Sequence, residues 1–301
     1  MLPAATEILC ALGLEVNLIG ISHECDFPRS IADLPVCASS KIDPEAGSLQ
    51  IDTAVKTILS QALSIYDLNI ALIKSLDPDF IVTQSQCKVC AVSLEDVETE
   101  LTDLLDKNVK VLSLEPQNLE DIINDIRTLG NEFNVDQQAN RLIEELEERI
   151  SIIKHKLKFI EIKPTVACIE WLSPMMVAGN WTPGLVNIAG GQPVIAEDGK
   201  HSPFIDFAQI LTENPDVIVV MPCGFPIERT LREINLLIDL PGWQELNAVK
   251  NNHIYIADGN QYFNRPGPRI VDSIEILAEI IHPKQFIFGY EGTGWIRFNV
   301  N

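Results

Sequence analysis

Long hydrophobic runs are missing from this chain of 301 residues. Apolar segments such as residues 217–221 and 286–288 are far shorter than the ~20 residues that a membrane-spanning helix needs, so we expect no membrane insertion. The N-terminus has no basic segment, and Glu7 follows too early for a secretory signal. For the sequence as it stands we therefore expect a cytoplasmic protein.

Positive charge is also scarce, because 22 Lys and Arg stand against 43 Asp and Glu, for a formal net charge of −21. Nucleic-acid phosphates and anionic membrane surfaces both require Lys and Arg, so this composition argues against both as partners. The negative charge fits either simple solubility or docking to a basic partner protein, and composition does not separate these two explanations.

Motifs of catalysis are missing too. The chain has no glycine-rich phosphate loop and no G-x-S-x-G nucleophile elbow, so we expect no enzyme. Its seven cysteines are an odd number in a large chain and do not form a disulfide pattern, which favours a reducing compartment.

Two segments of the chain are nearly the same, namely SLDPDFIVT at residues 75–83 and TENPDVIVV at residues 212–220. Each follows an amphipathic helix pattern and leads into a β-branched apolar run. Proline cannot continue a helix, and the residue before it favours extended geometry, so each Pro-Asp predicts a change from helix to strand. Two such units predict two similar α/β halves.

A long helix is predicted between these halves, because apolar residues recur at helical spacing over residues 136–159. It is either a surface helix of one domain or a stiff connector, and its central place in the chain favours the connector. We therefore expect an N-terminal α/β lobe at 1–135, the connecting helix at 136–159 and a C-terminal α/β lobe at 160–301. Alternating helices and short apolar strands predict parallel sheets covered on both faces.

Further elements are expected within each lobe. In the first, helices are predicted at 6–13, 52–63, 67–76, 94–105 and 119–129, the last of them ended by Gly130. Strands are predicted there at 18–22, 80–83 and 110–114, and a turn-rich loop at 28–48. In the second, strands are predicted at 165–170, 217–221 and 253–257, with helices at 182–189, 206–212, 227–238 and 268–282.

Candidate ligand-binding residues follow the predicted strands, because ligands of parallel α/β sheets bind beyond the carboxyl ends of the strands. Aromatic and polar side chains gather there, as a large amphipathic ligand requires. The candidates are Trp171, Trp181, Tyr262, Phe263, Arg265, His23 and Cys87. The two Trp could instead belong to a core.

The Cys87-x-x-Cys90 pair has three readings. It could be half of a metal site that His23 and Cys25 complete, a redox dithiol or direct ligand contact, or two small buried apolar side chains. The last reading is the most common for such a pair.

The order of several motifs resembles a known family. These are LPAATEIL at 2–9, LIGIS at 18–22, CDFP at 25–28, the two Pro-Asp segments, Gly190-Gly191 and Arg265-x3-Arg269. Together they resemble the vitamin B12 / iron-siderophore family of ABC-transporter substrate-binding proteins, most closely its cobalamin-binding branch. The resemblance covers nearly the whole chain.

The resemblance implies a class III periplasmic-binding-protein-like fold, with two Rossmann-like lobes joined by one long helix. It implies binding of cobalamin or another corrinoid between the lobes without catalysis, with Trp171, Tyr262, Phe263 and Arg265 as ligand contacts. Alternatives are a ferric siderophore or haem, or an intracellular metal-thiol or redox protein that uses Cys87, Cys90, Cys25 and His23.

The resemblance also implies a partner, because acidic residues of the family dock onto an ABC-transporter permease. Glu95 and Glu228 fall near those places, and we expect a monomer. Two features depart from the family. The chain begins where a first strand should end, so either the true start lies upstream or the N-lobe sheet lacks that strand. No secretion signal is present. A missing N-terminal signal would make the location periplasmic.

Overall fold

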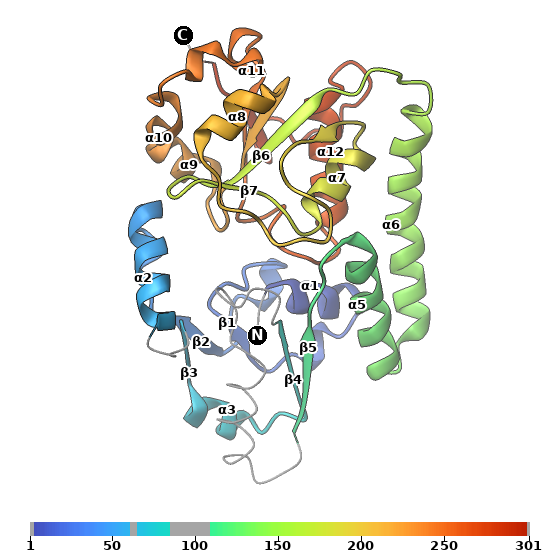
Figure 1. Ribbon diagram of the computed structural model, residues 1–301. Helices are drawn as coiled ribbons and strands as arrows, with labels where there is room; N and C mark the ends of the chain where they lie inside the picture. The colour runs from blue at the N-terminus through green and yellow to red at the C-terminus, as the bar shows by residue number, and fades with distance from the viewer. Residues whose placement is uncertain (1–2, 61–64, 85–108, 300–301) are drawn as a thin grey trace. The chain divides into compact units, whose positions relative to one another are not determined.

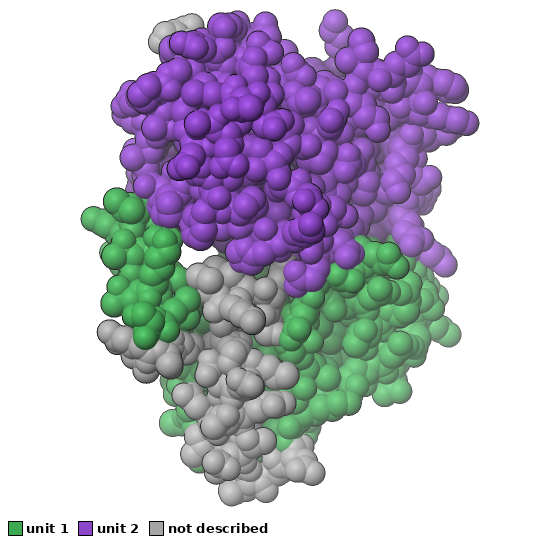
Figure 2. Space-filling model, viewed as in Figure 1, with its two compact units in different colours: residues 1–116, 120–143 green, residues 117–119, 144–301 purple. Residues whose placement is uncertain are grey.

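The computed structural model describes residues 3–60, 65–84 and 109–299. The chain forms two compact units, shown in different colours in Figure 2. Unit 1 contains residues 1–116 and 120–143, and unit 2 contains residues 117–119 and 144–301. The helix expected at 94–105, together with Cys87, Cys90 and Glu95, lies outside the described residues. No helix of the described part is long and apolar enough to cross a membrane.

Unit 1 contains two small sheets and the helices around them (Figure 1). One sheet has the order β1-β2-β3, in which β1 and β2 are parallel and β3 is antiparallel to β2. The other is the parallel pair β4 and β5. The elements are α1 (Pro3–Ala11), β1 (Ile21–Ser22), β2 (Val36–Ser40), α2 (Ser48–Ser60), β3 (Tyr66–Leu68), α3 (Ile70–Leu76), β4 (Phe80–Gln84), β5 (Lys110–Leu114) and α5 (Leu119–Glu132).

Unit 2 is built on one mixed sheet with the strand order β11-β10-β9-β6-β7, and β8 pairs with β6. Its strands are β6 (Thr165–Trp171), β7 (Met176–Val177), β8 (Gln192–Pro193), β9 (Val217–Val220), β10 (Ile254–Ala257) and β11 (Trp295–Arg297). Its helices are α7 (Thr182–Ile188), α8 (Phe207–Glu213), α9 (Ile227–Glu233), α10 (Asn235–Ile238), α11 (Asn247–Lys250) and α12 (Ile270–Ile281).

The sheet of unit 2 is buried on both faces, as its continuous apolar strands require. All four residues of β9 are at most 5% exposed. On one face Ile218 and Val220 belong to a core cluster with Leu237 of α10 and Trp243. Helices α7 and α12 contact each other and lie at the other side of the sheet (Figure 1). This burial fixes the strand ends that carry the candidate site.

The Pro-Asp repeat ends a helix in both units by the same geometry. Asp77 follows α3 with φ of 50° and Asn214 follows α8 with φ of 44°, and each precedes a proline. The residue before proline is therefore left-handed here and not extended, and short polar side chains tolerate this conformation best. Strands β4 and β9 begin two residues after the proline, as predicted.

The long helix α6 (Asp136–Lys156) has 21 residues and a length of about 32 Å. It continues from unit 1 into unit 2, because the division between the units falls after Ile143. The lobe limits at residues 135 and 159 stay predictions.

Several local predictions were wrong. Strand β2 lies inside the segment expected to be a loop, and residues 67–68 belong to β3 and not to a helix. Helix α5 continues through Gly130, where a Cβ would lie 2.4 Å from the Cβ of Ala139, so this glycine allows close helix packing and does not end the helix. The edge strands β3, β7 and β11 pair antiparallel, so the sheets are not purely parallel.

Candidate functional site

The ends of strands β6, β9 and β10 form a connected surface in unit 2, which we call the carboxyl edge (residues 170–171, 222–225 and 258–265). Backbone hydrogen bonds join its segments: Cys223 N–H donates to Glu170 O (3.1 Å), and Gly259 N–H donates to Phe225 O (3.0 Å). A Cβ on Gly259 would lie 2.1 Å from the carbonyl oxygen of Pro222, so only glycine fits there. The carboxyl edge is therefore a closely packed platform.

Trp171 is half-buried at this edge, and its orientation is fixed by several contacts. Its indole N–H donates to the carbonyl of Ser173 (3.1 Å). The indole packs edge-to-face against the ring of buried Phe225, with ring centroids 5.2 Å apart. The guanidinium carbon of Arg229 lies 3.9 Å from the centroid of Phe225. Trp171 thus offers a partly exposed aromatic surface on a rigid support.

The loop after β10 begins with a buried carboxyl group. Asp258 Oδ1 accepts hydrogen bonds from the backbone N–H of Asn260 (2.9 Å) and Gln261 (2.8 Å). Burial raises the pKa of Asp258, while these hydrogen bonds and the charge of Arg265 lower it and Glu228 raises it further. The Arg265 side chain is buried, and its Nη2 donates to Asn260 Oδ1 (3.2 Å). Arg265 therefore braces this loop from within.

The two aromatic residues of the same loop differ in exposure. Tyr262 is half-buried and packs edge-on against Tyr290, with centroids 5.8 Å apart. Phe263 is 1% exposed and has a φ of 61°. Its carbonyl accepts the indole N–H of buried Trp181 (2.6 Å), and its N–H donates to Ser273 Oγ (2.9 Å). Trp181 and Phe263 therefore support the loop from inside, while Tyr262 and Trp171 keep exposed surface.

His23 stands in unit 1, directly after β1. His23 is exposed, and the centroid of its imidazole lies 5.8 Å from the ring centroid of Tyr66. Cys25 is buried, and its Sγ lies 3.2 Å from Thr6 Oγ1 and 3.4 Å from Ser22 Oγ. The predicted partner Cys87 lies outside the described residues.

Three of the described thiols are not activated. Burial, followed by the charge of Glu15, raises the pKa of Cys10 to about 11. Burial also raises the pKa of Cys37, and raises that of Cys168 to about 12. A reactive thiol needs a lowered pKa, so these three cysteines lack the chemistry of a redox site. Among the described residues, no group of three or more His, Cys, Asp or Glu could hold a metal ion.

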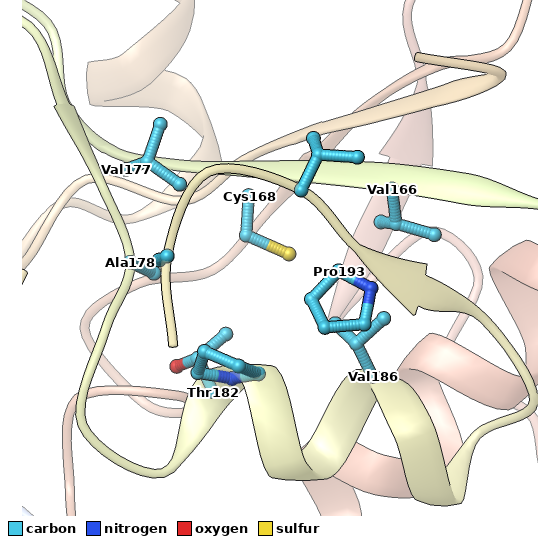
Figure 3. Close-up of a pocket in the computed structure, with 10 residues that line it drawn as sticks. Val166, Cys168, Val177, Ala178, Thr182, Val186 and Pro193 are labelled. Atoms are coloured by element: carbon cyan, nitrogen blue, oxygen red, sulfur yellow. The ribbon is translucent and has the colours of Figure 1, made fainter. Parts of the chain in front are cut away.

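A small apolar pocket lies beside α7, away from the predicted residues (Figure 3). Val166 and Cys168 of β6 line it together with Thr182 and Val186 of α7, and Pro193 of β8 closes one side. Its volume of about 10 Å³ leaves room for about one water molecule. The pocket is therefore a packing gap within unit 2 and too small for a macrocyclic ligand.

Sequence reasoning missed two residues, one in each unit, that contact a candidate residue or its support. Arg229 contacts the ring of Phe225, which lies four residues before it. This spacing indicates a side-chain contact within a helix, but Phe225 precedes helix α9, so the spacing did not reveal the contact. Tyr66 was overlooked because its neighbours were expected to form a helix, whereas it begins strand β3. Glu228 is exposed in the first turn of α9, and its docking role stays a prediction.

Comparisons with known proteins decide the family. A family model described as periplasmic binding protein matches residues 2–260. The chain belongs to the periplasmic binding protein family. This confirms the predicted family and its two-lobed α/β fold class, class III of the periplasmic binding proteins. Members of the family are solute-binding proteins and not enzymes.

Three similar proteins illustrate this family. The chain is 23% identical to an uncharacterized ABC transporter substrate-binding lipoprotein of Bacillus subtilis, over 95% of this chain and 80% of that protein. It is 24% identical to the vitamin B12-binding protein of Vibrio parahaemolyticus, over 92% of this chain and 86% of that protein. A solved periplasmic heme binding protein from Pseudomonas aeruginosa superimposes with a TM-score of 0.73 at 16% identity, covering 99% and 97% of the two chains.

Proposed function

We propose that this periplasmic binding protein binds a corrinoid, with cobalamin as the first candidate, and delivers it to an ABC-transporter permease. Family membership supports the delivery role, and the similar vitamin B12-binding protein supports the ligand. The observation that carries the proposal is Trp171, a half-exposed indole held against Phe225 at the carboxyl edge.

A corrinoid matches this surface chemically. Its macrocycle presents a broad apolar face, which stacks favourably on an aromatic ring, and its amide side chains need hydrogen-bond partners. The carboxyl edge also offers the half-buried ring of Tyr262 and the amide side chains of Asn260 and Gln261. A central aromatic anchor of this kind contributes about 2 kcal/mol to binding, which corresponds to about 30-fold in affinity.

Calorimetric titration with cyanocobalamin tests the proposal. We expect binding by the full chain, and Trp171→Ala should weaken it by about 30-fold. Phe159→Ala is the matched control, because this ring is 84% exposed in the segment between α6 and β6 and not at the carboxyl edge. Absence of binding at high micromolar cyanocobalamin would refute the corrinoid proposal, and equal affinities of the Trp171→Ala variant and the wild type would refute the placement at Trp171.

Haem is the second candidate, because the similar structure from Pseudomonas aeruginosa is that of a periplasmic heme binding protein. Titration with hemin under the same conditions separates the two ligands by their affinities. A ferric hydroxamate siderophore is more compact and lacks a flat macrocycle, so Trp171→Ala should affect its binding less. If the siderophore binds more tightly than both macrocycles, the macrocycle proposal fails.

The partner and the location follow from the same proposal. A permease would contact exposed Glu228 and also Glu95, which lies outside the described residues. The relative from Bacillus subtilis is a lipoprotein and the one from Pseudomonas aeruginosa is periplasmic, which supports a location outside the cytoplasmic membrane. The monomeric state stays a prediction.

A further inference from the structure

Two segments of unit 2 carry an excess of lysine. Residues 154–163 contain four lysines and one acidic residue, and residues 282–288 contain one lysine and no acidic residue. In the chain as a whole, Asp and Glu outnumber Lys and Arg by 43 to 22. Positive charge is therefore concentrated in these two segments, against the balance of the protein.

The two segments lie side by side in the folded unit. Nζ of Lys156, in the last turn of α6, lies 5.2 Å from the ring centroid of Phe286. Nε2 of His282, which follows α12, lies 3.1 Å from the carbonyl oxygen of Gly190. A Cβ on that glycine would lie 2.9 Å from Cδ1 of Leu157. The ends of α6 and α12 therefore converge, and the lysines that follow them share one part of the surface.

Large apolar side chains are exposed in the same segments. Phe159 and Ile162 are each 84% exposed, and Ile287 is 90% exposed. Contact of such side chains with water is unfavourable, and exposed apolar residues that gather in one place mark an interaction site. We call these three residues and the neighbouring lysines the basic-apolar patch, which comprises Lys154, Lys156, Lys158, Phe159, Ile162, Lys163, Lys284 and Ile287.

The lysines of this patch are not used to stabilise the fold through ion pairs. All five are exposed, and none of them pairs with a carboxylate in the part of the chain that the structure describes. The lysines that do form ion pairs lie outside the patch, namely Lys41, Lys56, Lys110 and Lys200. The dipole of α6 favours cations in its last turn, but it does not account for the lysines beyond the helix or for the exposed apolar side chains.

Cations beside exposed apolar groups match an anionic lipid layer. Lysines attract lipid phosphate groups, while Phe and Ile enter the boundary between headgroups and acyl chains. Nucleic acid would use the cations but has no apolar layer for side chains such as Ile287. A second copy of the chain would bring two sets of lysines face to face across a two-fold axis, which is repulsive.

We propose that unit 2 docks on an anionic phospholipid surface through the basic-apolar patch. The net charge of −21 opposes this attraction, but salt limits the reach of each charge to about 8 Å at physiological ionic strength. The charges nearest the lipid therefore decide, and the composition of the whole chain does not describe them. The inference goes beyond the proposed function and does not depend on the identity of the ligand.

Docking through this patch leaves the carboxyl edge accessible. The patch residues 158–163 precede β6, whereas Trp171 ends that strand. Strand β6 has seven residues that rise about 3.3 Å each, so its two ends lie about 20 Å apart. Lipid and ligand would therefore bind at opposite ends of β6.

Co-sedimentation of the full chain with lipid vesicles tests the proposal. We expect binding to vesicles that contain phosphatidylglycerol and none to vesicles of phosphatidylcholine alone. Binding should be lost as salt rises from about 0.1 M to about 1 M, because the screening length falls from about 10 Å to about 3 Å. Lys158→Glu combined with Lys163→Glu should weaken binding at least about 25-fold, since each lysine near an anionic surface contributes about fivefold.

Lys200→Glu combined with Arg232→Glu is the matched control. Both residues are exposed in unit 2, and they follow strands β8 and β9 whereas the patch precedes β6. The control changes the net charge by the same amount, and it should bind the vesicles nearly as the wild type does. Equal loss of binding in the two double variants would show that net charge, and not the patch, controls the interaction, and would overturn the proposal.

A fluorescent reporter shows whether the patch enters the lipid. Phe159→Trp should give a blue-shifted emission on phosphatidylglycerol vesicles and should be quenched by lipids with brominated acyl chains. The wild-type chain has no tryptophan in the patch and should show neither change. An unchanged Phe159→Trp spectrum on bound vesicles, or equal binding to both kinds of vesicle, would contradict docking through the patch.

Other occupants of the patch give different results. A concentration-dependent dimer that Phe159→Ala abolishes, or patch-dependent binding of RNA, without vesicle binding in either case, would assign the patch to that partner and reject the lipid surface. Without vesicles, both double variants should bind cyanocobalamin as the wild type does. Vesicle binding and cyanocobalamin binding therefore fail separately, so the lipid proposal and the proposed function are distinguishable.

Discussion

Removal of Arg149 tests what holds the long helix α6 to unit 2. Its guanidinium donates to Glu275 of α12 through Nε (2.9 Å to Oε1) and Nη2 (2.6 Å to Oε2), and to Asp272 through Nη2 (2.5 Å to Oδ1). Burial alone would lower the pKa of Arg149, but the hydrogen bonds with the two carboxylates hold it above its ordinary value. Arg149→Ala would leave two carboxylates, only 9% and 17% exposed, without their cation.

The expected cost follows from this burial. Removing one partner of a buried ion pair costs about 3–5 kcal/mol. The side chain of Arg149 is 35% exposed, so water screens part of the interaction and the cost should fall to about 2 kcal/mol. The hydroxyl of Tyr290 still donates to Glu275 Oε2 (2.9 Å) in the variant and limits the loss.

Urea unfolding followed by tryptophan fluorescence measures this cost. All four tryptophans of the chain belong to unit 2, so the signal reports on the unit that contains the Arg149 contacts. Lys154→Ala is the matched control, because Lys154 is an exposed residue of the same helix within unit 2, and we expect a change within about 0.5 kcal/mol. If Arg149→Ala also stays within that range, the ion pair does not stabilise the attachment.

The cost should also depend on pH. Burial raises the pKa of Asp272, and the hydrogen bond and charge of Arg149 oppose that rise. A carboxyl with a raised pKa in the folded state stabilises the fold while it is protonated, and this contribution is lost as the pH rises through the folded pKa. Arg149→Ala should therefore cost less at pH 5 than at pH 7. A cost that does not change with pH would show that lost packing, and not uncompensated charge, is the cause.

Two further predictions concern unit 1, and far-UV circular dichroism during unfolding measures both. Gly130→Ala should destabilise although Ala favours helices by about 1 kcal/mol, because its Cβ would lie 2.4 Å from the Cβ of Ala139; a gain in stability would contradict this packing. Burial, then the charges of Asp121 and Glu115, raises the pKa of Asp125 to about 7, and its buried Oδ2 has no hydrogen-bond partner. The stability that this proton contributes falls as the pH rises from the ordinary Asp range to about 7, so Asp125→Asn should stabilise unit 1 more at pH 8 than at pH 5; equal effects at both would refute the raised pKa.

Strongly patterned segments were predictable from the sequence. Strand β5 has the predicted limits, and α6 begins at the predicted Asp136 and ends three residues before 159. The Pro-Asp repeat located strands β4 and β9, because proline ends a helix wherever it occurs. In each case the signal is local, so the neighbouring residues suffice to determine the element.

Elements that depend on distant partners were missed. Strand β2 has the sequence VCASS, without an alternating or continuous apolar pattern, and it exists because it pairs with β1 and β3. Gly130 reads as a helix end, but the approach of Ala139 gives it another role. Likewise, nothing in the local sequence distinguishes buried Trp181 from half-exposed Trp171.

The sequence by itself determined the family, the helical or extended state of the periodic segments and the strand ends where a ligand site should lie. Only the tertiary structure decided which aromatic rings keep exposed surface and that Arg265 braces a loop from within. The physical reason is that burial and hydrogen bonding are set by partners far away in the chain, such as Trp181 for Phe263, whereas helix and strand propensities are set by neighbours.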